Sequence, residues 1–369
     1  MRQARANVSR VFPLPPLVAA ALLGVALLLA ARLSRPSPIA QLLQWAAGAA
    51  PLGWYLLGAV LGPGMGFMDR GVLEASAPVI AIAVGWVTAR AGAELATRRA
   101  APGVWAVGAF LVPAVLLFAA ARWLLAPSVE EWSVIGPIVA TLAAALALAG
   151  TAIPGRAAAA SMVLAAAALV AVLRPFTRVT DLKEVALWLG YAAGGAVLCA
   201  GLAIRLARRG SPRTATIAAL CLGAGIGAAS GTSPMVVCAL TGFALARWSI
   251  PHARLAGELA IHEPTVAAVL WTTAGAAIGG PLATVAIAAV LVALWPLGRR
   301  ILAGIAPTEP TLGLAIAVNF LLTPGHGTGD LERAVPTIAA LGLLLVRVTP
   351  VTRAAERLTP PARRVEVSV

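Results

Sequence analysis

Long apolar stretches separated by short polar connections run through most of this chain. A helix needs about 20 residues to cross a hydrocarbon layer ~30 Å thick, and most of the stretches have about that length. The pattern predicts an all-α polytopic membrane protein with about 13 transmembrane helices. The predicted spans cover residues 12–31, 51–68, 72–95, 102–125, 133–153, 157–173, 184–204, 214–230, 233–248, 264–279, 281–298, 310–323 and 334–348.

The composition agrees with this pattern and excludes an ordinary soluble domain. Hydrophobic residues make up 60% of the chain and charged residues 11%, and the mean hydropathy is +0.91. No connection between the spans is long enough to form a soluble domain. We therefore expect one transmembrane domain over residues 1–369, with a short cytoplasmic tail at 349–369.

The net charge of +14 would suggest a nucleic-acid partner in a soluble protein. Here 19 of the 28 Lys and Arg residues lie on one side, in the odd-numbered connections, at the span ends next to them or in the C-terminal tail. Cytoplasmic loops of membrane proteins carry the excess of Lys and Arg. The distribution predicts a multi-pass protein of the plasma (cell inner) membrane, with its N-terminus outside and its C-terminus cytoplasmic. The lipid bilayer is the expected partner, and nucleic acid is not.

Short sequence echoes recur at an offset of seven spans. The fifth span ends in Thr151–Gly155 and the twelfth in Leu322–Gly325, both with a Pro-Gly pair. Gly58–Gly62 in the second span likewise matches Thr241–Leu245 in the ninth. An odd offset inverts the orientation of a repeat in the membrane. The echoes indicate two inverted-topology repeats, although such pairs also recur by chance in a chain rich in Ala and Gly.

The repeats would cover about 12–173 and 214–348, joined by a linker helix at about 184–204. Transporters built from inverted repeats carry their substrate site near the bilayer midplane, where discontinuous helices meet. The fifth and twelfth spans are the expected discontinuous pair in this chain.

Four segments resemble motifs of the cation:proton antiporter (sodium/proton exchanger) superfamily. They are Pro51–Pro63, Ala91–Leu95, Ser233–Gly242 and 263–275, and they follow the order of the family's second, third, ninth and tenth helices. The resemblance implies the antiporter fold, in which the fifth and twelfth helices are broken and cross each other, here near Thr141 and Asn319. It also implies alternating-access transport of a monovalent cation or small solute, coupled to protons, and a homodimer.

The chain departs from this family where the ion-binding acids are expected. No Asp or Glu occurs anywhere in residues 132–180. Thr141 and Ser161 are the hydroxyls that remain near the family's acidic positions. A titratable acid at the midplane is what allows a transporter to exchange a proton for a cation. The sequence therefore predicts transport without the standard Asp-based proton coupling.

Six polar residues are candidates for the ion or substrate pathway: Thr141, Ser161, Asn319, Thr323, Glu263 and Glu94. Glu94 is four residues after Arg90, which favours a structural pair at a helix end. Glu263 precedes Pro264 at the start of a span, where a carboxylate favours the helix N-terminus. Either acid is alternatively a replacement for the missing one. Asn319 is either an interhelical hydrogen-bonding residue or part of the pathway.

No residue pattern in the sequence indicates an enzyme, a cofactor site or a metal site. The hypothesis is a secondary transporter of a cation, proton or small solute. The alternative is a transport-inactive protein with the antiporter fold, acting as a structural or regulatory membrane subunit. A homodimer is expected through the first three spans and spans eight to ten, where Gly24, Gly58, Gly223 and Gly227 allow close helix approach.

Overall fold

The computed structural model describes residues 50–68, 70–97, 142, 182–230, 233–248, 255, 258–259, 261–278, 310–322 and 333–348. Every element within these ranges is helical, which confirms the all-α fold class. The elements are α4 (Ala50–Ala59), the π-helix η2 (Val60–Gly64), α5 (Arg70–Ala75), α6 (Ala77–Thr97), α10 (Leu182–Ala207), α11 (Pro212–Ala229), α12 (Pro234–Trp248), α14 (Glu263–Ala276), α16 (Pro310–Leu321) and α18 (Val335–Val348).

The helix boundaries follow signals in the sequence. Pro212 and Pro264 occupy the first turns of α11 and α14, where a missing N–H is tolerated. Pro63 lies inside η2, where the chain widens from an α- into a π-helix. A proline cannot donate the next helical hydrogen bond, so the helix cannot continue unchanged. The chain then reverses at Gly66, which has a φ of 70° that glycine adopts without strain.

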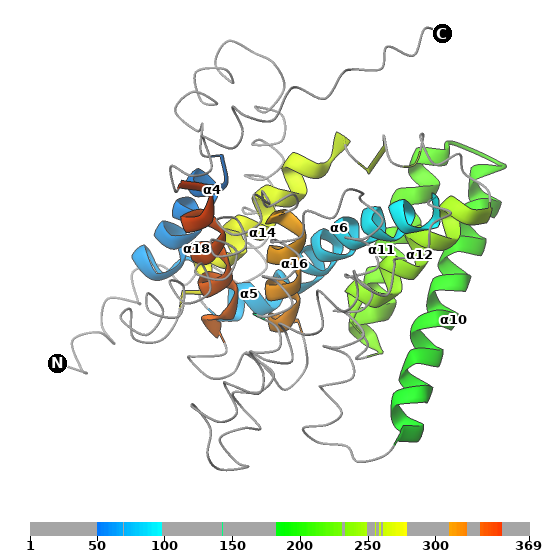
Figure 1. The fold of residues 1–369 in the computed structure, drawn as a ribbon, viewed down its shortest axis with the longest axis horizontal. Coiled ribbons are helices and arrows are strands. Elements are labelled where there is room, and N and C mark those ends of the chain that lie inside the picture. The colour runs from blue at the N-terminus through cyan, green and yellow to red at the C-terminus, as the bar shows by residue number, and fades with distance from the viewer. Residues whose placement is uncertain are drawn as a thin grey trace, which may run out of the picture.

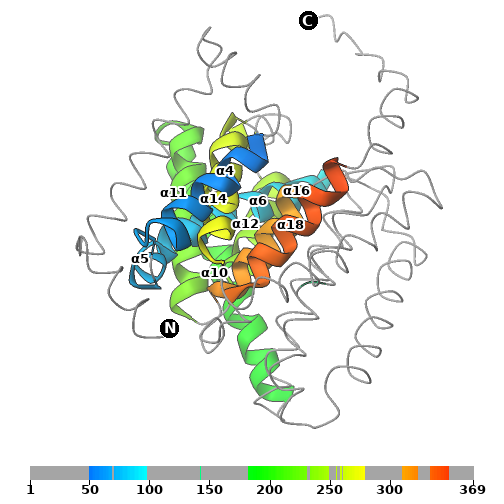
Figure 2. The same cartoon turned by 90° about the vertical axis from the view of Figure 1, so that its left-hand side faces the viewer.

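The described helices form one packed bundle (Figure 1). Helix α6 runs through its middle and packs most extensively on α12. Helices α10 and α11 cover one side of α12, and α4 packs on α14 at the opposite side of the bundle, next to α16 and α18. The turned view in Figure 2 shows the same grouping, with α4, α14 and α18 towards the viewer. The core lies between α6, α12, α14 and α16.

Helix α10 differs from the others because much of its surface is exposed. Within the described residues, the stretch Gly190–Ala207 is long and apolar enough to cross a membrane. Only 28% of that stretch is buried against the chain, whereas a core helix of a soluble protein is mostly buried. Its small residues Ala192, Ala196 and Ala203 face α11 and α12, and its large apolar residues face outward. The remaining apolar helices are shorter.

The structure covers eight of the thirteen predicted spans, at least in part, and each is helical there. The other five (12–31, 102–125, 133–153, 157–173 and 281–298) lie outside the described residues, except for Leu142, which packs against the core. The unwinding predicted near Asn319 does not occur at that residue. Helix α16 is continuous from Pro310 to Leu321 and closes with a Leu322 N–H to Asn319 carbonyl bond of 3.0 Å. The helix ends just before Pro324, which disfavours helical backbone at the residue before it.

Candidate functional site

Helices α4 and α14 cross in direct backbone contact. A methyl group placed on Gly58 would lie closer than 3.0 Å to the carbonyl oxygen of Thr272. A methyl group on Gly275 would lie equally close to the carbonyl oxygen of Tyr55. The two helices therefore approach to a separation that only glycine permits at these positions.

Helices α6 and α12 cross in the same way. A methyl group on Gly92 would overlap the carbonyl oxygen of Ala239, and one on Gly242 would overlap that of Ala89. In both crossings, each glycine meets the carbonyl group three residues before the partner glycine. The two crossings thus share one reciprocal register, although they are formed by four different helices.

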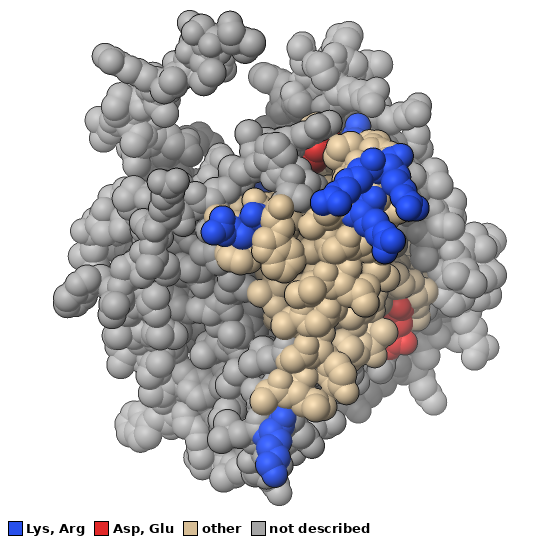
Figure 3. All heavy atoms as spheres, turned by 90° about the vertical axis from the view of Figure 1, so that its right-hand side faces the viewer, with Lys and Arg blue, Asp and Glu red and all other residues tan. Residues whose placement is uncertain are grey.

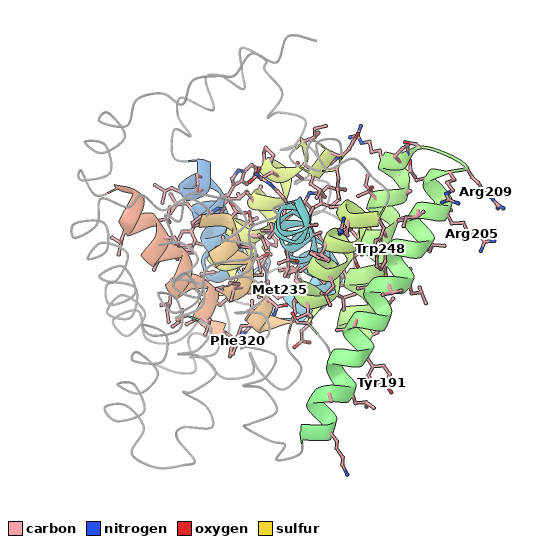
Figure 4. The ribbon with its side chains drawn as sticks, turned by 45° about the vertical axis from the view of Figure 1, so that its right-hand side comes forward. Tyr191, Arg205, Arg209, Met235, Trp248 and Phe320 are labelled. Atoms are coloured by element: carbon pink, nitrogen blue, oxygen red, sulfur yellow. The ribbon has the colours of Figure 1, made fainter. Side chains whose placement is uncertain are left out.

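A hydrogen bond between two uncharged side chains joins α12 to α16. The Ser233 hydroxyl donates to the Oδ1 atom of Asn319 at 2.8 Å. Ser233 also accepts from the N–H of Met235 at 3.2 Å, so it caps the first turn of α12. Asn319 is 1% exposed. Figure 4 shows the neighbouring Met235 and Phe320 inside the bundle, where both are buried. We call this pair the Ser233–Asn319 bridge.

The buried polar side chains of the described residues are all neutral: Ser76, Thr88, Thr216, Thr241, Thr272, Thr273, Asn319 and Thr337. Thr273 donates to the carbonyl of Val269, one turn earlier in its own helix, at 2.8 Å. Thr337 instead donates across helices, to the carbonyl of Ala274 at 2.6 Å. The Thr272 hydroxyl, at the α4–α14 crossing, has no hydrogen-bond partner within the described part of the chain. Hydroxyls and amides do not titrate near neutral pH, and among the described residues no Asp, Glu, His, Lys or Arg side chain is buried in this core.

Charged side chains gather where α14 begins. Arg90 of α6 forms an ion pair with Glu263, the first residue of α14. The Arg90 side chain is 16% exposed and that of Glu263 is 37% exposed, which places the pair at the boundary of the bundle. The carboxylate lies at the N-terminus of α14, where the positive end of the helix dipole stabilises a negative charge. The pair therefore links α6 to α14 across 173 residues of sequence.

A second contact set lies beside this pair. The Nη2 atom of Arg213 is 3.0 Å from Nε2 of His262. The Nε atom of Arg213 is 3.4 Å from a carboxylate oxygen of Glu258. The rings of His262 and Trp86 meet edge to face at 5.2 Å. The indole N–H of Trp86 donates to the Leu259 carbonyl at 2.9 Å. These contacts attach the start of α11 and the segment before α14 to the side of α6.

The structure brings two of the six predicted site residues into defined surroundings. Asn319 forms an interhelical hydrogen bond, one of the two roles predicted for it, and Glu263 lies at the start of a helix, as predicted. Glu94 lies within α6, but its side chain is not among those that the structure describes. Thr141, Ser161 and Thr323 lie outside the described residues.

Sequence reasoning missed Ser233 as a site residue. A Ser directly before a Pro at the start of an apolar run is a helix N-cap signal, and it was visible in Ser233-Pro234. What the sequence does not show is that the same hydroxyl also reaches a helix 86 positions away.

The glycines expected at a dimer interface pack inside one chain instead. Gly58 meets α14, Gly223 meets the side chains of Cys238 and Thr241, and Gly227 meets the backbone of Pro234. These three residues are therefore not available for close approach of a second copy. Gly24 lies outside the described residues.

Comparison with protein-family models and with curated proteins finds no match to this chain.

Proposed function

We propose that this chain is a multi-span membrane transporter with an antiporter-like inverted repeat, and that it moves a monovalent cation or another small solute by alternating access. The observation that carries the proposal is the shared register of the two glycine crossings. Each crossing brings a helix of the first repeat against a helix of the second.

The register relates the helices in the way that the seven-span offset requires. Gly242 lies 184 residues after Gly58, and Gly275 lies 183 residues after Gly92. Helix α4 therefore corresponds to α12, and α6 to α14. This relation exchanges the α4–α14 crossing with the α12–α6 crossing, as a pseudo-two-fold axis does. Such axes relate the halves of many secondary transporters and pass near their substrate sites.

The Ser233–Asn319 bridge supports a pathway at the junction of α12 and α16. Polar side chains inside a membrane bundle are costly unless they are bonded, and they mark substrate pathways. A serine hydroxyl and an asparagine amide together offer oxygen ligands for a small cation without offering a proton. The neutral core therefore favours flux that is not coupled to proton exchange at this bridge.

The ion pair with Arg90 indicates what Glu263 does in this scheme. Glu263 is the first residue of α14 and pairs with Arg90 of α6, so its expected role is to hold the two helices together. Because these helices belong to opposite repeats, the pair also restrains their relative movement at one end of the bundle.

The test is cation flux in proteoliposomes. Wild-type protein is reconstituted with a pH gradient, and both the gradient and uptake of labelled Na⁺ or Rb⁺ are followed. We expect no electrogenic Na⁺/H⁺ exchange, and cation uptake that varies less than about twofold between roughly pH 6 and pH 8.5, because hydroxyls and amides do not titrate there. Asn319→Leu should abolish the uptake, whereas Phe320→Leu, a neighbouring change without loss of a polar group, should retain it.

Three results would contradict parts of this scheme. Proton exchange that disappears in Glu263→Gln or Glu94→Gln would show that the coupling acid has moved to that residue. Exchange that survives both changes would place the site elsewhere in the chain. Folded protein without any flux would favour the transport-inactive structural subunit, for which the neutral core is the supporting observation.

A further inference from the structure

We propose that the turn joining α10 to α11 binds the headgroups of anionic phospholipids, whose acyl chains lie along the exposed face of α10. The proposal rests on the proposed function in one respect, namely that α10 lies in a bilayer. It adds a lipid class and a site.

Three arginines at this turn lack a partner within the described residues. Arg205 lies in the last turn of α10, and Arg208 and Arg209 follow it. All three are exposed, and their side chains make no ion pair or hydrogen bond with the described part of the chain. Arg90 and Arg213, by contrast, both meet carboxylates. Figure 4 shows Arg205 and Arg209 extending away from the bundle. Because no carboxylate of the described residues offsets these three charges, we expect an anion from outside the protein to bind there.

The same helix face is apolar below the arginines. Leu198, Leu202 and Leu206 are 59%, 40% and 41% exposed. Their spacing of four residues forms a stripe that leads to Arg209. Beside it, no atom of the described residues lies within 4 Å of the position that a methyl group would take on Gly201. Figure 3 shows a broad surface without charged groups on this side, with basic residues gathered towards one end, a single basic group at the other end and acidic atoms at its edges.

The dimensions match one leaflet of a bilayer. With a rise of 1.5 Å per residue, Leu198 lies about 16 Å below Arg209 along the helix, close to half of a hydrocarbon layer ~30 Å thick. Lys183 lies about 33 Å from Arg205 on the same basis. Trp248, at the end of α12, is 57% exposed and lies at a similar height to Arg205 in Figure 4. Exposed tryptophans are typical of the membrane–water interface.

An anionic phospholipid can bind both the three arginines and the leucine stripe. Its phosphate accepts hydrogen bonds from guanidinium groups, often two at once. Its acyl chain covers the leucine stripe. A zwitterionic lipid would cover the stripe equally well but carries no net charge to offset the three arginines. The arginines therefore provide selectivity for anionic lipid.

The experiment compares lipid binding by wild type with that of the triple variant Arg205→Gln/Arg208→Gln/Arg209→Gln. Purified protein in neutral detergent is titrated with phosphatidylglycerol or phosphatidylcholine. Bound lipid is counted by native mass spectrometry, and thermal unfolding is recorded in parallel. Each arginine near an anionic surface contributes a factor of about five to binding, so the triple variant should bind phosphatidylglycerol roughly 100-fold more weakly. Binding of phosphatidylcholine should not change.

A single-charge pair provides the matched control. Arg209→Gln should weaken phosphatidylglycerol binding about fivefold, whereas Lys183→Gln, at the other end of α10, should leave this site unchanged. Soluble glycerol phosphate should not raise the unfolding temperature, because it lacks the acyl chain. Equal binding of phosphatidylglycerol by wild type and the folded triple variant would overturn the proposal, as would a protein dimer that occupies this face in place of lipid.

Failure of the membrane assignment gives a different result. Wild-type protein mixed with phosphatidylcholine vesicles should float with them after carbonate extraction, and so should the triple variant. Protein that floats but shows no preference for phosphatidylglycerol overturns only the lipid site. Protein that does not float overturns the proposed function, and with it the basis for this site.

Discussion

Replacing Gly275 by Ala should destabilise the protein, although alanine is the better helix former. The added methyl would lie closer than 3.0 Å to the carbonyl oxygen of Tyr55. That oxygen belongs to backbone, so the strain is relieved only by moving α4 away from α14. Overpacking of this kind costs about 1–3 kcal/mol. The helix-propensity gain of roughly 0.5–1 kcal/mol offsets part of it, and we expect a net loss of about 1–2 kcal/mol of unfolding free energy.

Gly201 provides the matched control. It also lies inside a helix, but a methyl there would meet no atom within 4 Å in the described part of the chain. Gly201→Ala should therefore show only the propensity gain and stabilise the protein by up to about 1 kcal/mol. The two variants carry the same chemical change, so their difference isolates the cost of the crossing.

The assay is thermal unfolding in detergent, followed by intrinsic tryptophan fluorescence. The chain has 10 tryptophans, and the buried Trp271 lies one turn before Gly275. At about 2–4 °C per kcal/mol, Gly275→Ala should unfold roughly 2–8 °C lower than wild type, and Gly201→Ala slightly higher. The reasoning fails if Gly275→Ala is as stable as Gly201→Ala, because the helices would then have room at the crossing.

The shared register extends the test to the second crossing. The methyl group added in Gly242→Ala would overlap the carbonyl oxygen of Ala89, just as the one added in Gly275→Ala would overlap that of Tyr55. The two variants should therefore lose similar unfolding free energy, within about 1 kcal/mol. If only one of the two variants loses unfolding free energy, the two crossings are not equivalent. That result would weaken the assignment of an inverted repeat.

Three further outcomes concern contacts between distant segments. In a double-mutant cycle, Ser233→Ala and Asn319→Ala should be less than additive by about 0.5–1.5 kcal/mol, and full additivity would argue against the bridge. A cycle of Arg90→Gln with Glu263→Gln should give a coupling of about 1 kcal/mol that shrinks in high salt, since both side chains are partly exposed. Trp86→Phe keeps an aromatic ring at this position but removes the N–H donor, so the unfolding temperature should fall by roughly 2–4 °C, and an unchanged value would show that the bond contributes nothing.

The extent of most described helices follows from the sequence alone. The apolar run at 184–204 becomes α10 from Leu182 to Ala207, and the run at 233–248 becomes α12 from Pro234 to Trp248. Run length, prolines at helix starts and the Ser-Pro cap are local signals, because a helix bonds within itself. The end of α16 close to Pro324 also follows from local backbone sterics. The break expected near Asn319 rested on the Pro-Gly echo and on the family resemblance, whereas α16 is helical through that residue.

The partners across helices were decided by the tertiary structure. Sequence spacing predicts a pair between Arg90 and Glu94, since neighbours at i and i+4 share a helix face; the side chain of Glu94 lies outside the described part of the chain. The fold also brings Arg90 to Glu263, 173 residues away, and no spacing within a helix indicates that contact. The echo at Gly58 was visible in the sequence, but its reason was not: the glycine matters because a backbone carbonyl of another helix occupies the space of its missing side chain. Such a contact depends on how two helices cross, and no periodicity within either helix specifies it.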